Sequence, residues 1–333
     1  MAFGKLGQAL TVREIFDMIQ DDLRLIEAEI GLESIAPVEA ITMIGQYLQA
    51  SGGKRLRPSL LLLAAKMVGG AGPGAVRLGA VVEMIHTATL VHDDVIDAAE
   101  TRRGRPSTNA RWGNHISVLS GDWLYMQAFQ IALRERNFHI LDLLISLTQA
   151  MVEVELLQLE RIGRIGVTEA DYMELVDRKT ASLFSVCTKL GALVGGADAG
   201  AEERLGEFGW NLGMAFQLTD DVLDFTSREK TLGKPVGSDL REGKVTLPLI
   251  YAMGDAEAGE RAKIETILRS RNYDEVPLAD VLAIIRKYRG FERAGERALA
   301  FTAKARRVIN EFPESPYQRA MYAITELVTD RDH

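Results

Sequence analysis

The chain has 333 residues, of which 47% are hydrophobic and 26% are charged, and its formal net charge at pH 7 is −8. This composition excludes a disordered chain and permits a large buried core. The negative charge disfavours nucleic acid as a partner. Basic residues nevertheless gather around Arg57 and Arg103, as expected where a small anion binds.

No apolar run approaches the roughly 20 residues that span a bilayer, so we expect no integral membrane segment. The stretch from Met1 to Gln20 has neither a continuous apolar core nor a small-residue cleavage site, and the predicted location is therefore cytoplasmic. Cys187 is the only cysteine of the sequence, which excludes an intramolecular disulfide and a multi-cysteine zinc site.

In chain order, glycine and proline interrupt the sequence near residues 31, 52–53, 69–74, 104–106, 163–166, 195–200, 233–235 and 254. The intervening segments are roughly 15 to 25 residues long and show helical spacing of apolar residues, as between Leu141 and Val154. Alternating β-branched runs are scarce. We predict an all-α bundle of ten or more helices and, because nothing marks a linker, a single domain over residues 1–333.

The first candidate site is the sequence His92-Asp93-Asp94-Val95-Ile96-Asp97, which follows a long apolar stretch. On a helix, Asp93 and Asp97 lie one turn apart on one face, with Asp94 displaced to the side. The second candidate site, Thr219-Asp220-Asp221-Val222-Leu223-Asp224, repeats the DDxxD form after another apolar stretch. The two motifs could therefore face each other across a cavity in the bundle.

The clustered aspartates indicate a bound cation. Like charges one helical turn apart repel each other, and an apolar helix has no structural use for three aspartates. Their oxygen ligands favour Mg²⁺, which usually binds one or two carboxylates together with phosphate oxygens of a substrate. A single motif could equally be a solvated helix end, but two copies in matching contexts favour the metal site.

With further motifs in the same order, the sequence resembles the trans-prenyl diphosphate synthase family over nearly its whole length. These further motifs are Gly52-Gly53-Lys54-Arg55-Leu56-Arg57-Pro58, Arg102-Arg103-Gly104, Lys179-Thr180, Phe216-Gln217-Leu218-Thr219-Asp220-Asp221, Gly233-Lys234 and Lys244. The resemblance implies the isoprenoid synthase fold, a single helical bundle around a central cavity. It also implies Mg²⁺-dependent, head-to-tail condensation of isopentenyl diphosphate onto an allylic diphosphate, with farnesyl or geranylgeranyl diphosphate as the expected primer.

The resemblance assigns roles to individual residues. Asp93 and Asp97 are expected to bind two magnesium ions and Asp220 a third, while Asp94, Asp221 and Asp224 act mainly through waters. The allylic diphosphate is expected to contact Arg102, Lys179, Thr180, Gln217, Lys234 and Lys244. Isopentenyl diphosphate is expected at Lys54, Arg57, His86 and Arg103, a mixture of cations suited to phosphate. The expected catalytic set is Asp93, Asp97, Asp220, Lys179, Thr180, Gln217 and Lys234, with Thr180 and Gln217 stabilising the allylic cation.

Product length is expected to depend on residues just before the first motif. In the family, bulky aromatic residues there stop growth, whereas small residues open a deeper tunnel. The corresponding residues here are Ala88 and Thr89, and Ile85 and Met84 complete the predicted chain-length set. The surrounding sequence resembles octaprenyl and decaprenyl synthases that make quinone side chains. We therefore expect products of about 40 to 50 carbons, longer than one straight helix can flank at about one isoprene unit per turn. The tunnel floor on the facing helix is left open, with three candidates that could equally fill the core, Met126, Phe129 and Leu133.

The resemblance also implies a homodimer, which the apolar positions between Ile116 and Leu133 favour. Three alternatives remain: a prenyl diphosphate synthase with a shorter product, a class I terpene cyclase of the same fold, and a catalytically silent partner subunit. Cyclases usually lack the second DDxxD motif, and silent subunits usually lose one of the two. Both motifs are intact here, which favours chain elongation.

Overall fold

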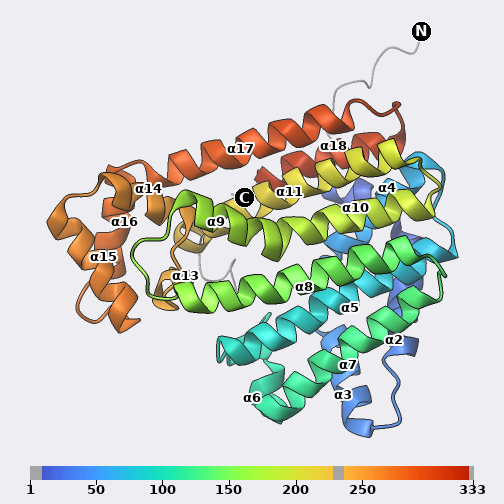
Figure 1. Cartoon of the computed structure of the whole chain (residues 1–333), viewed down its shortest axis with the longest axis horizontal. Helices are drawn as coiled ribbons and strands as arrows, with labels where there is room; N and C mark the ends of the chain where they lie inside the picture. The colour runs from blue at the N-terminus through green and yellow to red at the C-terminus, as the bar shows by residue number, and fades with distance from the viewer. Residues whose placement is uncertain (1–9, 228–235, 330–333) are drawn as a thin grey trace.

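The computed structural model describes residues 10–227 and 236–329, which form a bundle of long helices (Figure 1). Its elements are α1 (Val12–Asp17), α2 (Gln20–Glu33), α3 (Glu39–Ala50), α4 (Leu56–Val68), α5 (Pro73–Ile96), β1 (Thr101–Arg102), β2 (Arg105–Pro106), α6 (Thr108–Trp112), α7 (Asn114–Leu133), α8 (Phe138–Arg161), α9 (Glu169–Val176), the π-helix η1 (Asp177–Ala181), α10 (Ser182–Val194), α11 (Ala199–Thr226), α13 (Ser238–Arg241), α14 (Leu247–Asp255), α15 (Ala258–Ser270), α16 (Leu278–Lys287), α17 (Gly290–Ile309) and α18 (Pro316–Thr329). The all-α prediction of ten or more helices is confirmed.

Local sequence signals explain where the helices of the site begin. Helix α5 starts with Pro73, whose missing N–H and fixed φ suit the first helical turn. Helix α9 starts with a capping box, in which Thr168 and Asp171 each bond the other's backbone N–H. Helix α11 starts after Asp198, whose carboxylate accepts a bond from the N–H of Ala201.

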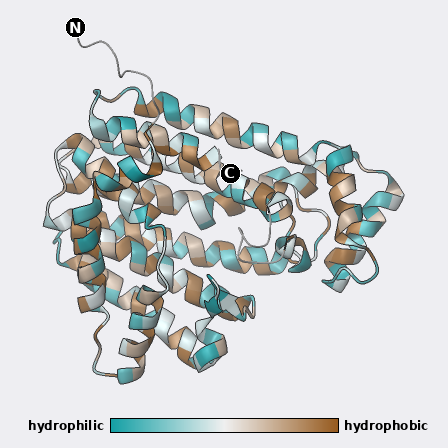
Figure 2. Cartoon of the chain, turned by 180° about the vertical axis from the view of Figure 1, so that it is seen from behind, coloured by the Kyte–Doolittle hydropathy of each residue, from teal (hydrophilic) through white to brown (hydrophobic). Residues whose placement is uncertain are grey.

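The long helices run along the longest axis of the molecule and enclose the main core (Figure 1). Helix α11 packs most extensively on α10 and α17, and α5 packs most extensively on α7. Helix α4 contributes Leu60 to Ala65, which are all fully buried. Seen from behind, polar and apolar segments alternate around most outer helices, as expected for amphipathic helices that cover one core (Figure 2).

A smaller hydrophobic cluster lies at one end of the bundle, where α14, α15 and α16 gather (Figure 1). Its buried members include Leu249, Ile264 and Ile285. The strands in the described part of the chain are β1 and β2, an antiparallel hairpin that pairs Thr101 with Pro106. The assignment of residues 1–333 to one domain stays a prediction.

Helix α5 differs from the interpretation that no apolar stretch of the sequence approaches the length of a membrane span. Its 24 residues, Pro73–Ile96, are long and apolar enough to cross a membrane by length and composition alone. Of its most apolar window, 61% is buried inside the protein, as in the core helix of a globular protein. Helix α5 is the only such helix in the described residues.

Between α9 and α10 the chain forms one turn of π-helix, η1, which the sequence did not predict. Such turns are rare and are frequent at functional sites, because they change the direction of the side chains that follow. Helix α11 approaches η1 closely at Gly213, where an added Cβ would lie 2.6 Å from the Cα of Ala181. A glycine is needed for this contact, which brings Thr180 next to α11.

Candidate active site

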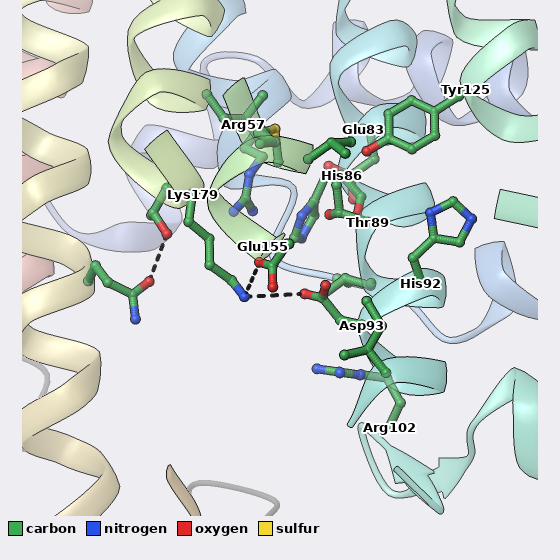
Figure 3. Close-up of a pocket in the computed structure, with 18 of the residues that line it drawn as sticks. Arg57, Glu83, His86, Thr89, His92, Asp93, Arg102, Tyr125, Glu155 and Lys179 are labelled. Carbon is green, nitrogen blue, oxygen red and sulfur yellow. Dashed lines mark hydrogen bonds and ion pairs between the residues drawn. The ribbon is translucent and has the colours of Figure 1, made fainter. Parts of the chain in front are cut away.

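A cavity of about 980 Å³ opens among α4, α5, α7, α8, η1 and α11 (Figure 3). Apolar side chains, among them Leu90, Met151 and Phe216, form much of its wall. Asp93 of the first aspartate motif and Asp220 of the second both line it, so the two motifs share one cavity. A smaller adjoining cavity of about 310 Å³ is bounded by Asp93 and Asp97 of the first motif.

Asp93 projects toward Lys179 across the cavity (Figure 3), and its carboxylate lies 3.9 Å from the ammonium nitrogen. The same ammonium group forms an ion pair with Glu155 of α8. Burial raises the pKa of Asp93 to about 6, because Lys179 only partly offsets the loss of water and Glu155 adds a second negative charge. The site therefore holds more buried negative charge than this one lysine can neutralise.

Asp97 is the C-cap of α5 and faces the adjoining cavity. Its two oxygens lie 3.2 and 3.3 Å from the ammonium of Lys244, which also bonds Glu242 at 2.8 Å. Burial works to lower the pKa of Lys244, but the carboxylates of Asp97 and Glu242 outweigh it and raise that pKa. Lys244 is thus a firmly charged partner of the first motif.

The remaining aspartates of the two motifs accept hydrogen bonds from the protein. Oδ1 of the buried Asp94 accepts two bonds from the guanidinium of Arg102, at 2.5 and 2.9 Å. The two oxygens of Asp221 accept bonds from the hydroxyl of Tyr172 at 2.6 Å and the amide of Gln217 at 2.7 Å.

Asp224 is 1% exposed and is held by the segment that precedes and begins α13. It accepts bonds from the Ser238 hydroxyl at 3.0 Å and the Asp239 N–H at 3.3 Å. All three aspartates thus accept hydrogen bonds from the protein, and the role of Asp94, Asp221 and Asp224 through waters stays a prediction.

The donor set fits Mg²⁺. Asp93 and Asp97 present hard oxygen ligands one helical turn apart, and Asp220 lies on the wall of the same large cavity as Asp93. Across residues 10–227 and 236–329, no three His, Cys, Asp or Glu side chains form a cluster that could hold an ion by themselves. Magnesium sites are commonly completed by substrate phosphates and waters.

A basic corner borders the cavity where α4 begins. Arg57, His86, Arg103 and Lys54 all line it, so the structure brings together the four residues predicted to bind isopentenyl diphosphate. The Nε of Arg57 is buried with no hydrogen-bond partner in the described part of the protein. Burial and the neighbouring guanidinium groups lower the pKa of His86 well below its usual value, so this imidazole is neutral near pH 7.

The loop before α4 is fixed by a buried ion-pair network that the sequence did not reveal. Arg55 has a left-handed backbone, with φ of 46°. Its guanidinium bonds Glu27 of α2 and, at 2.5 Å, Glu83 of α5. Arg55 is therefore occupied by these carboxylates, whereas Arg57 is directed to the cavity.

The π-helix places Lys179 and Thr180 on the cavity wall. The Thr180 hydroxyl donates to the Gln217 carbonyl oxygen at 2.9 Å, so the two residues expected to stabilise a cation are in direct contact. Arg102 borders both cavities. Lys234, expected at the allylic diphosphate, lies outside the described residues.

Comparison with known proteins decides the family. Residues 38–285 match the family model described as polyprenyl synthetase. The chain belongs to the polyprenyl synthetase family. It is accordingly a prenyltransferase.

Individual members of the polyprenyl synthetase family align over almost the whole chain. The octaprenyl diphosphate synthase of Haemophilus influenzae is 37% identical over 329 residues, which cover 99% of this chain and 100% of that protein. A short chain isoprenyl diphosphate synthase of Methanothermobacter thermautotrophicus is 35% identical, with 96% and 99% covered. A crystal structure of polyprenyl synthase from Caulobacter crescentus, complexed with calcium and isoprenyl diphosphate, superposes with a TM-score of 0.92 at 32% identity, over 98% of this chain and 100% of that one.

Of the residues predicted to set product length in this prenyltransferase, some line the cavity and others lie in the core. Thr89 lines the cavity, but Met84, Ile85 and Ala88 are buried in the main core. Helix geometry accounts for this: relative to Asp93, Thr89 lies about 40° around the helix, whereas Ala88 lies about 140° away. This angle was readable from the sequence.

The candidate tunnel floor also differs from the sequence-based set. Met126 and Leu133 are 63% and 45% exposed, on the outside of the bundle, and Phe129 packs against the core. The residues of α7 that line the cavity include Val118, Asp122 and Tyr125, and the ring of Tyr125 projects toward α5 near Thr89 (Figure 3). Sequence alone did not identify Tyr125, because a tyrosine on a mostly apolar helix looks like a core residue.

Proposed function

We propose that this protein is a long-chain all-trans-polyprenyl diphosphate synthase, which extends farnesyl or geranylgeranyl diphosphate with isopentenyl diphosphate and serves quinone side-chain synthesis. The observation that carries the proposal is that three kinds of side chain line one cavity. They are carboxylates of both aspartate motifs, the basic corner around Arg57, and apolar side chains such as Leu90, Met151 and Phe216. A reaction between two diphosphates that builds a hydrocarbon tail needs these three environments.

The carboxylates of Asp93, Asp97 and Asp220 would hold up to three magnesium ions together with the allylic diphosphate. The family depends on magnesium in general, and the Caulobacter crescentus structure with calcium and isoprenyl diphosphate supports a divalent ion beside diphosphate. When bound, the ions would stabilise the charge that develops on the departing pyrophosphate. Arg102, Lys179 and Lys244 border the same region and would add fixed positive charge.

Isopentenyl diphosphate would occupy the basic corner without a metal. Arg57 offers a buried guanidinium, and the neutral imidazole of His86 can donate an N–H to phosphate without adding charge. Glu83 and Arg55 hold the loop in place behind this corner. The carboxylates, through magnesium, would bind the allylic diphosphate, and the basic corner would bind isopentenyl diphosphate. The two diphosphates would therefore occupy separate sites in one cavity.

The proposed reaction proceeds by ionisation, condensation and elimination. The allylic carbon–oxygen bond breaks to give a carbocation and pyrophosphate. The isopentenyl double bond then forms the new carbon–carbon bond, and a proton leaves, with the released pyrophosphate as its acceptor. The oxygens of Thr180 and Gln217 would stabilise the cation, because both lie on the cavity wall in mutual contact. No side-chain nucleophile is needed.

Product length is tested by incubating the purified protein with Mg²⁺, radiolabelled isopentenyl diphosphate and either primer, then separating the dephosphorylated products by thin-layer chromatography. We expect products of about 40 to 50 carbons, whose tails exceed one helix at about one isoprene unit per turn. Products of about 20 to 35 carbons would instead favour a shorter-chain synthase, the class of the Methanothermobacter thermautotrophicus relative. A cyclised hydrocarbon formed without isopentenyl diphosphate would overturn the proposal.

We also propose a homodimer formed through α7 and α8. Large apolar side chains are exposed on both helices, among them Leu119 at 67%, Met126 at 63% and Leu156 at 60%. Exposed apolar surface of this kind is typical of protein–protein interfaces. Sedimentation equilibrium at micromolar concentration should give twice the chain mass, and Leu119→Lys should shift the species toward the monomer. A fully active monomeric wild type would contradict this proposal.

A further inference from the structure

Three side-chain hydrogen bonds link helix α9, helix α11 and the π-helix η1 through the interior. The Tyr172 hydroxyl donates to Oδ2 of Asp221 at 2.6 Å, and the Gln217 amide donates to Oδ1 of Asp221 at 2.7 Å. The Thr180 hydroxyl in turn donates to the Gln217 carbonyl oxygen at 2.9 Å. Tyr172 and Asp221 are 4% and 5% exposed, and both border the smaller cavity that also borders Asp97.

The chemistry of the groups fixes the direction of every bond in this chain. The Gln217 amide presents its NH₂ group to Oδ1 of Asp221, because its carbonyl oxygen accepts the hydrogen bond from Thr180 on the opposite side. The carbonyl oxygen of Gln217 then points the other way, toward Thr180 on the cavity wall. An amide turned over would place N–H donors, with their partial positive charge, on that side instead.

We propose that Tyr172 is a positioning residue of the prenyl transfer reaction. Its hydroxyl fixes Asp221, and Asp221 holds the Gln217 amide so that its carbonyl oxygen faces the position where the allylic cation forms. This inference rests on the proposed function, in which Gln217 stabilises that cation. Asp221 then acts through Gln217 by accepting two protein hydrogen bonds, and the metal-binding carboxylate of the second motif is Asp220.

Burial strengthens the hydrogen bonds that Tyr172 and Gln217 donate to Asp221. Hydrogen bonds to a charged group in a water-poor site are short and directional, and the loss of one donor leaves a carboxylate oxygen unsatisfied. Without the Tyr172 hydroxyl, Asp221 can rotate or attract water, and the orientation of Gln217 is no longer fixed. The ring of Tyr172 also packs in the main core, which Tyr172→Phe would leave in place.

Steady-state kinetics of Tyr172→Phe test the proposal. We expect kcat to fall about ten- to a hundredfold, the effect of losing one hydrogen bond to a buried charge. The KM values for both diphosphates and the half-saturating Mg²⁺ concentration should stay within about twofold, because no substrate or metal contact is removed. Tyr288→Phe is the matched control: its hydroxyl donates to Glu260 at 2.6 Å in the smaller cluster, and its kcat should not change.

A double-mutant cycle separates positioning from a merely structural role. Gln217→Leu removes the amide, and Tyr172→Phe in that background should slow the enzyme no further, because Tyr172 acts through Gln217. Rate losses that multiply would overturn the proposal. So would a raised Mg²⁺ requirement of Tyr172→Phe with normal kcat at saturating Mg²⁺, because Asp221 would then serve the metal.

A second pair of variants keeps the test decisive even if Tyr172→Phe folds poorly. In Asp221→Asn the side chain can donate to the Tyr172 oxygen and accept from the Gln217 amide, so the orientation of Gln217 is kept. We expect Asp221→Asn to turn over at least about tenfold faster than Asp221→Ala. Equal loss in both variants would show that the charge of Asp221 is what matters, which would overturn the inference. Failure of the wild type to extend a primer would instead reject the proposed function.

Discussion

In the first aspartate motif, Asp93 and Asp97 both face cavities and lie near lysines, at 3.9 Å from Lys179 and 3.2 Å from Lys244. In the second motif, Asp220 lines the large cavity, whereas Asp221, at the edge of the smaller cavity, and the buried Asp224 accept hydrogen bonds from protein donors. The two motifs have the same DDxxD spacing. Their carboxylates nevertheless have different environments, most clearly at the last position, where Asp97 faces a cavity and Asp224 is buried.

The difference follows from where each helix ends. Helix α5 ends at Ile96, so Asp97 is its C-cap and sits at the negative end of the helix dipole, where a cation is favoured. Helix α11 continues to Thr226, and the N–H of Gly237 bonds the carbonyl of Asp224. The chain thus folds back over the last aspartate of the second motif. A repeated motif therefore need not repeat its function residue by residue.

The largest effects are expected where the two motifs are equivalent. Asp93→Ala and Asp220→Ala should each reduce turnover at least about a thousandfold, roughly 4 kcal/mol of transition-state stabilisation, because each removes a cavity-facing carboxylate that we propose as a metal ligand. Circular dichroism should show an unchanged helix content. Wild-type rates in either variant at saturating Mg²⁺ would contradict the assigned site.

The next prediction tests the asymmetry itself at the last aspartate of each motif. Asp97→Asn should lower kcat about a hundredfold, because it removes a charge from the metal-facing side. Asp224→Asn should change kcat by less than about tenfold but lower the free energy of unfolding by about 1 to 3 kcal/mol, since one of its two buried acceptor oxygens is replaced by an NH₂ donor that faces another donor. Turnover and thermal denaturation of both variants measure this. Equal losses of turnover would mean that the motifs work alike.

A third prediction contrasts the proposed metal sites with the basic corner, where we propose that diphosphate binds without a metal. Arg57→Gln should raise the KM for isopentenyl diphosphate about ten- to a hundredfold, while the Mg²⁺ requirement stays the same. Arg105→Gln is the control, because Arg105 stacks over the Tyr47 ring, 4.3 Å from its centroid, near the same loop. A higher Mg²⁺ requirement in Arg57→Gln would show that the proposed metal site and the basic corner are not separate binding sites.

The sequence was enough to predict the all-α fold from its periodicity and both aspartate motifs from residues adjacent in the chain. The basic corner, whose residues lie between positions 54 and 103, was predicted from the family resemblance. It did not predict the bond from Tyr172 to Asp221, which joins residues 49 positions apart. Nor did it predict η1, because a π-turn has no spacing signal of its own. The hydrogen-bonded state of Asp221 and Asp224 likewise depends on how distant segments pack.

The smallest effect on turnover, but a clear effect on product, is expected at Thr89. Thr89 lines the cavity on the same side of α5 as Asp93, so an aromatic ring there would stand in the path of the growing tail without touching the carboxylates. With farnesyl diphosphate as primer, Thr89→Phe should shorten the main product to about 20 carbons, roughly one helical turn of tail beyond the primer, with kcat for this first condensation changed by only a few-fold.

Ala88→Phe is the matched variant one residue away. Ala88 is fully buried in the main core, so the added ring should first overpack the α5 interface and lower the free energy of unfolding by about 1 to 3 kcal/mol. Thin-layer separation of dephosphorylated products and thermal denaturation distinguish the two. If Ala88→Phe is stable and shortens the product while Thr89→Phe does not, the tail follows the core side of α5, as the family pattern had predicted. If Thr89→Phe alone shortens it, the tail runs along the face that carries the first aspartate motif, past Tyr125.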